Sequence, residues 1–212
     1  MTYKPTTYTT TIAGLRHKLR MINIITQNVS NVSTISYKRQ IPESLSFNSI
    51  LNDVALHDES EGVFKKTNNN FDLAIEGNAY FLVDSKEGPI PIRNGKFKLN
   101  EKGNLVTDDG YDVIVIDKTD KPVSLASTND IKIDSDGEIF VGTEKYGRIA
   151  LQILDNKPVR IHQGYVEGSN VDLISEMTAL SMTFRSFEAS EKTLGMEMSV
   201  ERDLIEKYGR NV

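Results

Sequence analysis

The chain has 212 residues, no cysteine and a formal net charge of −5, so it can fold as one sizeable domain or two small ones, and disulfides, thiolate metal sites and thiol nucleophiles are excluded. With 38% hydrophobic and 26% charged residues it is too apolar for a disordered chain. It lacks the roughly 18 uninterrupted apolar residues of a membrane-spanning helix and the apolar core of a cleavable signal peptide. We therefore expect a folded chain without membrane insertion and without a cleavable signal peptide.

Residues 1–39 predict an N-terminal helix with one apolar stripe. Apolar side chains recur there in steps of four and three, interrupted only at Thr26: Tyr8, Ile12, Leu15, Leu19, Ile22 and Val29. This spacing is the heptad seam of a helix that packs against a partner helix. Asn, Ser and Thr crowd residues 27–34 and compete for backbone hydrogen bonds, so we expect the helix to end there.

The middle of the chain predicts a connector followed by a β domain. Residues 40–61 contain Pro42, several serines and a small apolar cluster at 45–51, and could hold a short helix. In residues 62–165 short β-rich runs alternate with glycine-containing turns. No long helical pattern interrupts them, which favours an antiparallel β domain over a doubly wound parallel sheet.

Residues 166–212 predict a C-terminal helix. Ser169 or Asn170 is the candidate N-cap, and Asp172 and Glu176 favour the helix N-terminus. The stripe again steps by four and three, interrupted at Glu191 and Glu201, and its apolar members are Leu173, Met177, Leu180, Phe184, Phe187, Leu194, Met198, Ile205 and Tyr208. Because such a seam demands a partner and the N-terminal seam is the only other one, we expect an α+β fold whose two ends pair as a coiled coil. An ordinary amphipathic helix lying on its own domain is the alternative.

The charge distribution agrees with pairing of the ends. Residues 1–42 carry six bases and no acid, whereas residues 166–212 carry nine acids and five bases. A basic arm for nucleic acid is the competing interpretation, but it lacks the interleaved aromatic residues typical of that function. We therefore expect complementary ends and no nucleic-acid partner.

Motifs for catalysis or ligand binding are weak. The three histidines have no metal-ligand spacing: His17, His57 and His162. Residues 134–138 resemble the start of a calcium loop, but Thr143 stands where that loop needs its glutamate, so a hairpin turn is favoured. No glycine pattern fits a nucleotide cradle. The sequence therefore predicts no enzyme, no cofactor, no metal and no small-molecule substrate.

Several ordered strings resemble bacterial flagellar rod and hook proteins. Residues 28–39 are similar to that family's Asn-Asn-Leu-Ala-Asn-Val-x-Thr-x-Gly-Phe-Lys-Arg signature, with Ser36 in place of glycine at a turn that serine fits poorly. Residues 70–83 resemble its Leu-Asp-Leu-Ala-Ile-x-Gly-x-Gly-Phe-Phe-x-Val string. Four further segments resemble its Arg-x-Gly-x-Phe, Gly-x-Leu-Val-Thr-x-x-Gly, Ser-Asn-Val-x-x-x-x-Glu-Met and Arg-x-Phe/Tyr-Glu-Ala elements: residues 93–97, 103–110, 169–177 and 185–189.

The resemblance implies a structural subunit of the flagellar basal body. Such subunits are exported unfolded through the flagellar type III apparatus and polymerise, with copies of themselves and with other rod proteins, into the rod that spans the periplasm. Paired terminal helices form the inner tube and the β domain sits outside. Gly168 before Ser-Asn-Val and the tail at residues 207–210 favour a proximal-rod over a distal-rod subunit. The alternative outside the family is a β-domain binding module with a coiled-coil dimer, acting as an assembly factor.

The expected polymer interface combines the two heptad seams with two asparagines of the signature. Its members are Leu15, Leu19, Ile22, Asn28, Asn31, Met177, Leu180, Phe184, Phe187, Leu194 and Met198. For Asn28 and Asn31 a local cap at the helix end and a contact between subunits are equally favoured.

Overall fold

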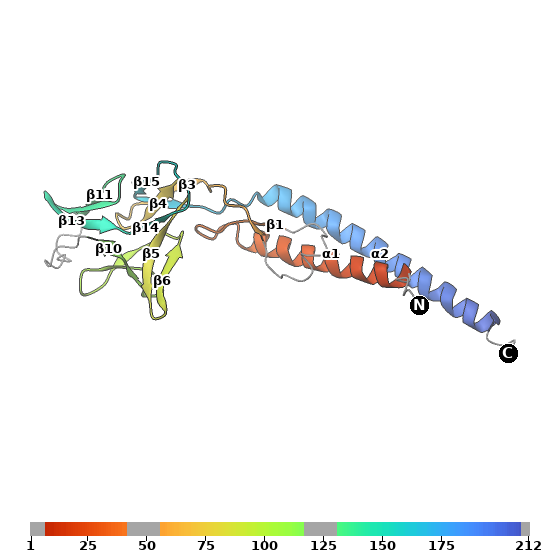
Figure 1. Cartoon of the computed structure of the whole chain (residues 1–212). Coiled ribbons are helices and arrows are strands. Elements are labelled where there is room, and N and C mark those ends of the chain that lie inside the picture. Colours follow the sequence, from red (N-terminus) through yellow and green to blue (C-terminus); the bar gives the residue numbers. More distant parts are fainter. Residues whose placement is uncertain (1–6, 42–55, 117–130, 209–212) are drawn as a thin grey trace. The chain divides into compact units, whose positions relative to one another are not determined.

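The computed structural model describes residues 7–41, 56–116 and 131–208, drawn in colour in Figure 1. They form two compact units, which we call the helical unit and the β unit. The helical unit contains residues 7–32, 39–41, 56–58 and 171–208, and the β unit contains residues 33–38, 59–116 and 131–170. The segments 33–38 and 166–170, which we assigned to the two ends of the chain, therefore belong to the β unit. The apolar cluster of the connector, residues 45–51, lies outside the described residues.

Two helices dominate the helical unit. Helix α1 (Thr7–Ser30) and helix α2 (Leu173–Tyr208) pack against each other. They run antiparallel, because the start of α1 contacts the later part of α2 and the end of α1 contacts its first turn (Figure 1). A short antiparallel ladder of β1 (Gln40–Ile41) and β2 (Leu56–His57) belongs to the same unit. Neither helix of the described part has an apolar stretch that could cross a membrane.

Asp172 caps α2, two or three positions later than the expected cap at Asn170 or Ser169. Its Oδ1 accepts the backbone N–H of Ile174 at 3.1 Å, and its Oδ2 accepts the hydroxyl of Ser175 at 2.5 Å. The hydrogen bond from Ser175 is the first cause that holds the pKa of Asp172 below its ordinary value of 3.8. The carboxylate thus satisfies donors that the first helical turn leaves without an intrahelical acceptor.

The strands of the β unit all pair antiparallel, which confirms the expected β domain. The larger sheet has the order β14 (Leu151–Ile153), β5 (Ala79–Ser85), β9 (Asp112–Val113), β8 (Leu105–Val106), β7 (Lys98–Leu99), with β6 (Gly88–Ile92) also paired to β5. A second sheet has the order β10 (Val115–Ile116), β13 (Glu144–Ile149), β12 (Glu138–Val141), β11 (Ile131–Ile133). Two further ladders join β15 (Arg160–Gln163) to β4 (Leu73–Glu76) and β16 (Tyr165–Glu167) to β3 (Phe64–Lys66).

The core of the β unit follows from alternation along its strands. In β5 the side chains of Ala79, Phe81 and Val83 are buried on one face, as the two-residue period of a strand requires. Phe97 packs edge-on against Phe81 with ring centroids 5.1 Å apart. The region that resembled a calcium loop is the hairpin between β11 and β12, where Asp134 Oδ1 accepts the backbone N–H of Glu138 at 2.9 Å. The hairpin prediction is therefore confirmed.

Gly95 lies where two backbone segments approach closely. Its carbonyl accepts the N–H of Leu73 at 2.8 Å, and a Cβ at this position would lie 1.8 Å from the carbonyl oxygen of Leu73 and 2.8 Å from the ring of Phe81. No L side chain fits there without moving backbone. The Arg-x-Gly-x-Phe string thus places a glycine against β4 and Phe97 in the core.

We expect Gly95→Ala to lower the free energy of unfolding of the β unit by about 3 kcal/mol or more, because the methyl group overpacks a rigid backbone contact. Chemical denaturation followed by near-ultraviolet circular dichroism measures the change. Lys86→Ala, at an exposed turn of the same unit, is the control and should change stability by less than about 0.5 kcal/mol. A Gly95→Ala protein as stable as this control would contradict the steric argument.

Candidate functional site

Two of the α1 residues that face α2 lie one position before the residues expected in the apolar stripe. Ile22 is buried as expected, but Ile25 is buried where Thr26 was expected, and Leu19 remains 47% exposed. Lys18 takes the place of Leu19 on the packed side, where its Nζ donates to the carbonyl of Ser186 at 2.9 Å and to the hydroxyl of Ser190. The seam steps by three and then four from Leu15 rather than by four and then three, which keeps the heptad period and shifts the stripe around the helix.

Polar contacts recur along the helix pair. Thr11 donates its hydroxyl to Glu197 Oε2 at 3.3 Å near one end, and Asn28 contacts Glu176 near the other, with Lys18 between them. Polar side chains in such a seam have satisfied partners in only one register. The register of α1 against α2 is therefore set by hydrogen bonds as well as by apolar packing.

Asn28 is the centre of a buried polar cluster in the helical unit. Its side chain is 0% exposed and binds both backbone groups of Gln40, donating Nδ2–H to the carbonyl and accepting the N–H at Oδ1, each at 2.9 Å. Its Nδ2 also lies 3.3 Å from Glu176 Oε2, and Glu176 Oε1 accepts Arg39 Nε–H at 2.5 Å. The buried carboxylate of Glu176 is thus paired with a guanidinium and an amide.

The two signature asparagines make their described side-chain contacts within the chain. Asn28 joins the end of α1 to β1 and α2, and Asn31 donates Nδ2–H to the carbonyl of Gln27 at 2.8 Å, which satisfies an acceptor of the last helical turn. Of the two alternatives for these residues, the local one is therefore the arrangement seen in the subunit. Full burial of Asn28 leaves its amide no surface to offer another molecule.

A second buried carboxylate, Glu167, organises the β unit. It is 2% exposed and accepts three hydrogen bonds from three segments: Oε1 accepts Lys38 Nζ–H at 2.8 Å and the N–H of Gly62 at 3.0 Å, while Oε2 accepts Arg93 Nε–H at 2.5 Å. The remaining donors of Arg93 reach backbone carbonyls of Ile75, Gly77 and Ala79. Burial by itself raises the pKa of Glu167. The hydrogen bonds from Lys38, Gly62 and Arg93 together lower it by more than burial raises it, so the pKa lies below its ordinary value of 4.5.

Consecutive bases of the signature serve different units. Lys38 bonds Glu167 within the β unit, and the next residue, Arg39, bonds Glu176 within the helical unit. Lys38 and Arg39 lie in the signature at residues 28–39, which by itself predicts no ion pair for either, and Glu176 was expected only to favour the helix N-terminus. Charged residues at the edges of apolar segments were the available signal, but their pairing over more than 120 positions cannot be read from spacing.

Ser36, which stands where the resembled signature has glycine, adopts a left-handed backbone conformation. Its φ is 56°, and it is the residue other than glycine with positive φ among those described. Its N–H donates to the carbonyl of Glu167 at 2.9 Å, and its hydroxyl donates to the carbonyl of Arg93 at 3.2 Å. The turn therefore survives the substitution because two hydrogen bonds hold a conformation that serine seldom adopts.

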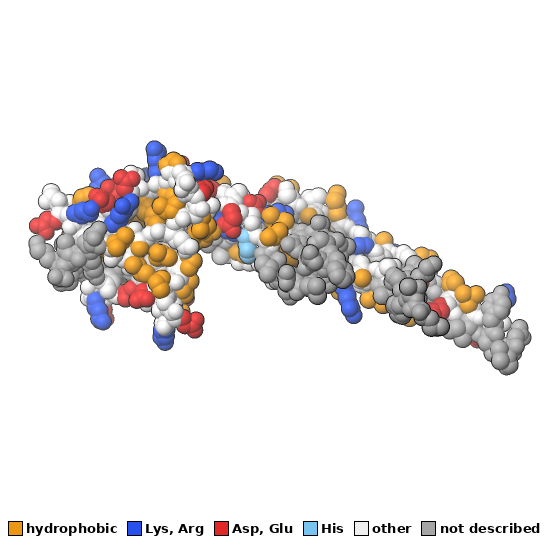
Figure 2. Space-filling model, in the orientation of Figure 1, with side chains coloured by type: hydrophobic (Ala, Val, Ile, Leu, Met, Phe, Trp, Pro, Cys, Tyr) orange, Lys and Arg blue, Asp and Glu red, His pale blue; other side chains and the backbone are white. Residues whose placement is uncertain are grey.

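The expected interface residues divide by exposure. Those that are buried or half-buried are Leu15, Ile22, Asn28, Asn31, Leu180, Phe187 and Leu194, and those that are exposed are Leu19, Met177, Phe184 and Met198. Figure 2 shows hydrophobic side chains at the surface of both helices. The expected set thus mixes side chains shielded within the helix pair with side chains that the subunit leaves uncovered.

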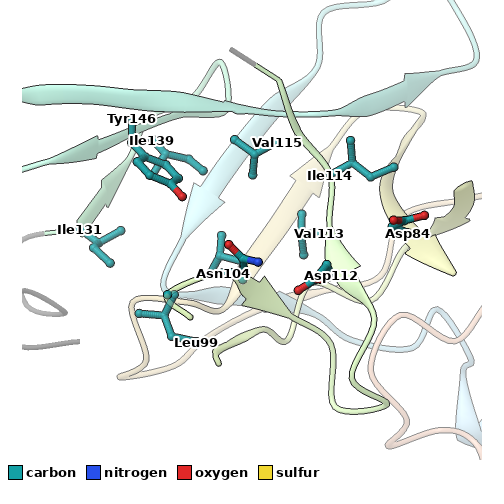
Figure 3. Close-up of a pocket in the computed structure, with 12 residues that line it drawn as sticks. Asp84, Leu99, Asn104, Asp112, Val113, Ile114, Val115, Ile131, Ile139 and Tyr146 are labelled. Carbon is teal, nitrogen blue, oxygen red and sulfur yellow. The ribbon is translucent and has the colours of Figure 1, made fainter. Parts of the chain in front are cut away.

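The β unit also contains a cavity of about 240 Å³ (Figure 3). Its wall is mostly apolar, with Val113, Val115 and Tyr146 among the lining residues, and Asp84 and Asp112 are its acidic members. His162 lies elsewhere and bonds Glu76 at 2.8 Å. In the described part of the chain, no three histidine, aspartate or glutamate side chains gather as metal ligands would.

We expect Asn28→Ala to lower the free energy of unfolding of the helical unit by about 1–3 kcal/mol, because both backbone groups of Gln40 lose their partner. Thermal unfolding followed at 222 nm measures it. Asn23→Ala, at an exposed position of α1, is the matched control and should leave stability unchanged or slightly raised. Equal melting temperatures for the two variants would show that Asn28 does not stabilise the subunit.

We expect Glu167→Gln to destabilise the β unit by about 3–5 kcal/mol at neutral pH, because two cations lose their carboxylate. Since the folded pKa of Glu167 is lowered, its contribution is complete above pH 4.5 and is lost as the pH falls through the folded value. Urea denaturation of both proteins from pH 7 to pH 3 should therefore show a stability difference that shrinks below about pH 4.5. The exposed Glu101→Gln should show no such difference, and a pH-independent gap for Glu167→Gln would argue against ionic pairing.

Comparisons with known proteins agree along most of the chain. The family described as "Flagellar hook protein FlgE/F/G D1 domain" matches residues 74–141, and the one described as "Flagellar basal body rod FlgEFG protein C-terminal" matches residues 162–199. These matches include most of the β unit and the larger part of α2.

Curated relatives extend the match to nearly the full length. The flagellar basal-body rod protein FlgF of Mesorhizobium japonicum is 26% identical, with 90% of this chain and 92% of the relative covered. FlgF of Rhizobium meliloti is 28% identical over 80% and 83%, and the rod protein FlgG of Bacillus subtilis is 23% identical over 92% and 96%. The ordered motifs, the antiparallel β domain between two packed helices and these matches agree: the chain belongs to the flagellar basal-body rod protein family.

Proposed function

We propose that this chain is a structural subunit of the bacterial flagellar basal-body rod, polymerising through its paired terminal helices with copies of itself and with other rod proteins. Membership of the rod protein family supports the class of function. The proposed mechanism rests on one observation, an apolar stripe on α2 that remains exposed in the subunit. No catalytic role is proposed for any residue.

The uncovered stripe is defined by Met177, Phe184 and Met198. Their spacings are multiples of seven, so they lie on one line along α2, and each is about half exposed or more. Phe187 and Leu194 lie on the neighbouring, shielded line. Exposed apolar surface on a helix that already has one partner indicates a second packing surface. In an assembled rod this second surface would complete a coiled-coil bundle with helices of neighbouring subunits.

We place the subunit in the proximal rod. Two of the relatives described above are FlgF proteins, the member of the family that we assign to the proximal rod, and Gly168 before Ser-Asn-Val favours the same assignment. Similarity to FlgG keeps the distal rod as the alternative. Delivery through the flagellar type III apparatus, without a cleavable signal peptide, completes the proposal and would bring the chain to the periplasm-spanning part of the basal body.

A β-domain binding module that forms a discrete coiled-coil dimer is the competing function. It would use the same stripe of α2 to close a pair rather than to build a tube. Electron microscopy of assembled protein separates the two, because a subunit of the rod forms helical arrays, whereas an assembly factor stays dimeric at every concentration.

We expect Phe184→Asp to abolish rod assembly and motility while lowering the stability of the isolated subunit little, because in the proposed rod the exposed part of this ring packs against neighbouring subunits. Phe187→Asp should instead lower the stability of the helical unit by about 2 kcal/mol, since its half-buried ring packs within the subunit. Circular dichroism at 222 nm and electron microscopy of basal bodies distinguish these effects.

Met196→Asp is the matched control, because it puts the same charge in place of an exposed apolar side chain of α2 that lies off the line of Met177, Phe184 and Met198. It should change neither stability nor assembly. Normal swimming of cells that carry only the Phe184→Asp subunit would contradict the proposed role of the stripe.

A further inference from the structure

We infer that Pro89 and Pro91 close the free edge of β6 against the addition of another strand, so that β units brought close together do not pair edge to edge. The inference concerns the β unit alone. It goes beyond the proposed function and does not depend on it. It follows from which backbone groups of β6 face β5 and which face outward, and the hairpin of these two strands can be followed in Figure 1.

Strand β6 is the longest strand at an edge of the two larger sheets. It has five residues and pairs with β5 alone, whereas the other edge strands of these sheets have two or three residues in the described part of the chain: β14, β7, β10 and β11. Very short edge strands offer little backbone for pairing. The free side of β6 is therefore the largest opening for strand addition in these two sheets.

The register of β6 turns the backbone of Pro91 outward. Pro91 lies opposite Leu82 of β5. The N–H of Leu82 donates to the carbonyl of Ala150 at 3.1 Å, and its carbonyl accepts the N–H of Ile114 at 2.9 Å, so both groups point away from β6. In an antiparallel ladder two opposite residues either exchange hydrogen bonds or both turn their backbone groups away from each other. The ring nitrogen of Pro91 therefore faces the free edge.

The same alternation applies along the rest of β6. Pro89 lies two residues before Pro91, opposite Asp84, and shares its orientation. The three remaining residues of the strand alternate with the prolines and turn their backbone groups toward β5. Because proline has no N–H, the free edge between residues 88 and 92 offers carbonyl acceptors but no donor. The acceptors of an added strand would therefore have no partner there.

Apart from its prolines, β6 has the composition of a strand that pairs readily. It carries no charged side chain, and Ile90, which lies on the same face as the buried Val83, is 40% exposed. Charged side chains commonly protect an edge, and an uncharged strand with β-branched residues is prone to pairing. Within residues 88–92 the two prolines are therefore the features that oppose strand addition.

A second edge of the β unit is closed in a different way. At β11 the side chain of Gln163 accepts the N–H of Ile133 at 3.1 Å and donates to the carbonyl of Ile131 at 3.0 Å. Its carboxamide thus takes the place of a peptide group of a neighbouring strand. One edge lacks donors and another already has partners for its backbone groups. The β unit therefore limits strand addition at more than one place.

Sedimentation velocity of the full chain over a concentration series tests the inference with Pro89→Thr and Pro91→Thr combined. Threonine is a good strand former, supplies an N–H at both positions and adds no apolar surface. The reference protein and the variant both carry Phe184→Asp, so that the stripe of α2 contributes equally to both. The variant should associate at least about tenfold more tightly than the reference, because paired edges gain hydrogen bonds that proline cannot donate.

Hydrogen exchange locates the new contact. Protection of the amides in residues 86–93 of the threonine variant should rise with protein concentration, whereas the reference should show no such rise. Pro158→Thr makes the same replacement in an exposed loop of the β unit and should leave association unchanged. Near-ultraviolet circular dichroism should show the same folded β unit in every variant.

Replacement of both prolines by lysine separates edge pairing from loosened folding. Pro89→Lys with Pro91→Lys supplies the same N–H groups but sets like charges against each other in a paired edge, so this variant should associate no more tightly than the reference. Equal association of the lysine and threonine variants would ascribe the effect to loosened folding and overturn the inference. A folded threonine variant that sediments like the reference at every concentration, or that associates without protection of β6, would overturn it as well.

Discussion

The ionised carboxylate of Glu167, enclosed at 2% exposure, is the constraint on which the β unit depends. A buried charge is costly unless cations and hydrogen-bond donors surround it. Lys38, Gly62 and Arg93 supply these donors from three separate segments, and Arg93 extends the network to carbonyls around β4 and β5. The chain segments that enter and leave the β unit are thereby held to its strands. Loss of any one partner would leave an uncompensated charge in the interior, so the network tolerates only one arrangement.

The helical unit also contains a buried carboxylate, which a different set of residues stabilises. Glu176 is buried on the first turn of α2 and meets the guanidinium of Arg39 and the amide of Asn28. Asn28 in turn satisfies the backbone of β1, so the end of α1, the first turn of α2 and the strand after α1 form one polar centre. Polar groups in a helix seam reduce stability relative to apolar ones, but they specify register, and the contacts of Lys18 and Thr11 continue that specification along the pair.

A pair whose register is set by polar contacts can keep some of its apolar side chains for other molecules. Phe187 is shielded in the subunit, whereas Phe184, three positions earlier, is exposed on the next line of α2. The same helix thus packs one face within its own chain, and the proposed function assigns the exposed face to neighbouring subunits. For a polymerising subunit this division is useful, because the monomer can fold before assembly and still retain the surface that assembly requires.

Sequence alone determined the parts of this structure that depend on local pattern. Alternation with glycine turns predicted the antiparallel β domain, heptad spacing predicted a helix at each end, and the strings around Lys38 and Gly95 identified the family resemblance. Only the tertiary structure decided that Ile25 rather than Thr26 is buried, that Lys38 and Arg39 bind different carboxylates, and that Asp172 caps α2. A heptad period specifies that a helix has a seam, but neighbouring lines on one helix fit it almost equally well. Contacts between residues more than 100 positions apart, such as those of Lys18 and Asn28, select one line, and spacing along the chain carries no record of them.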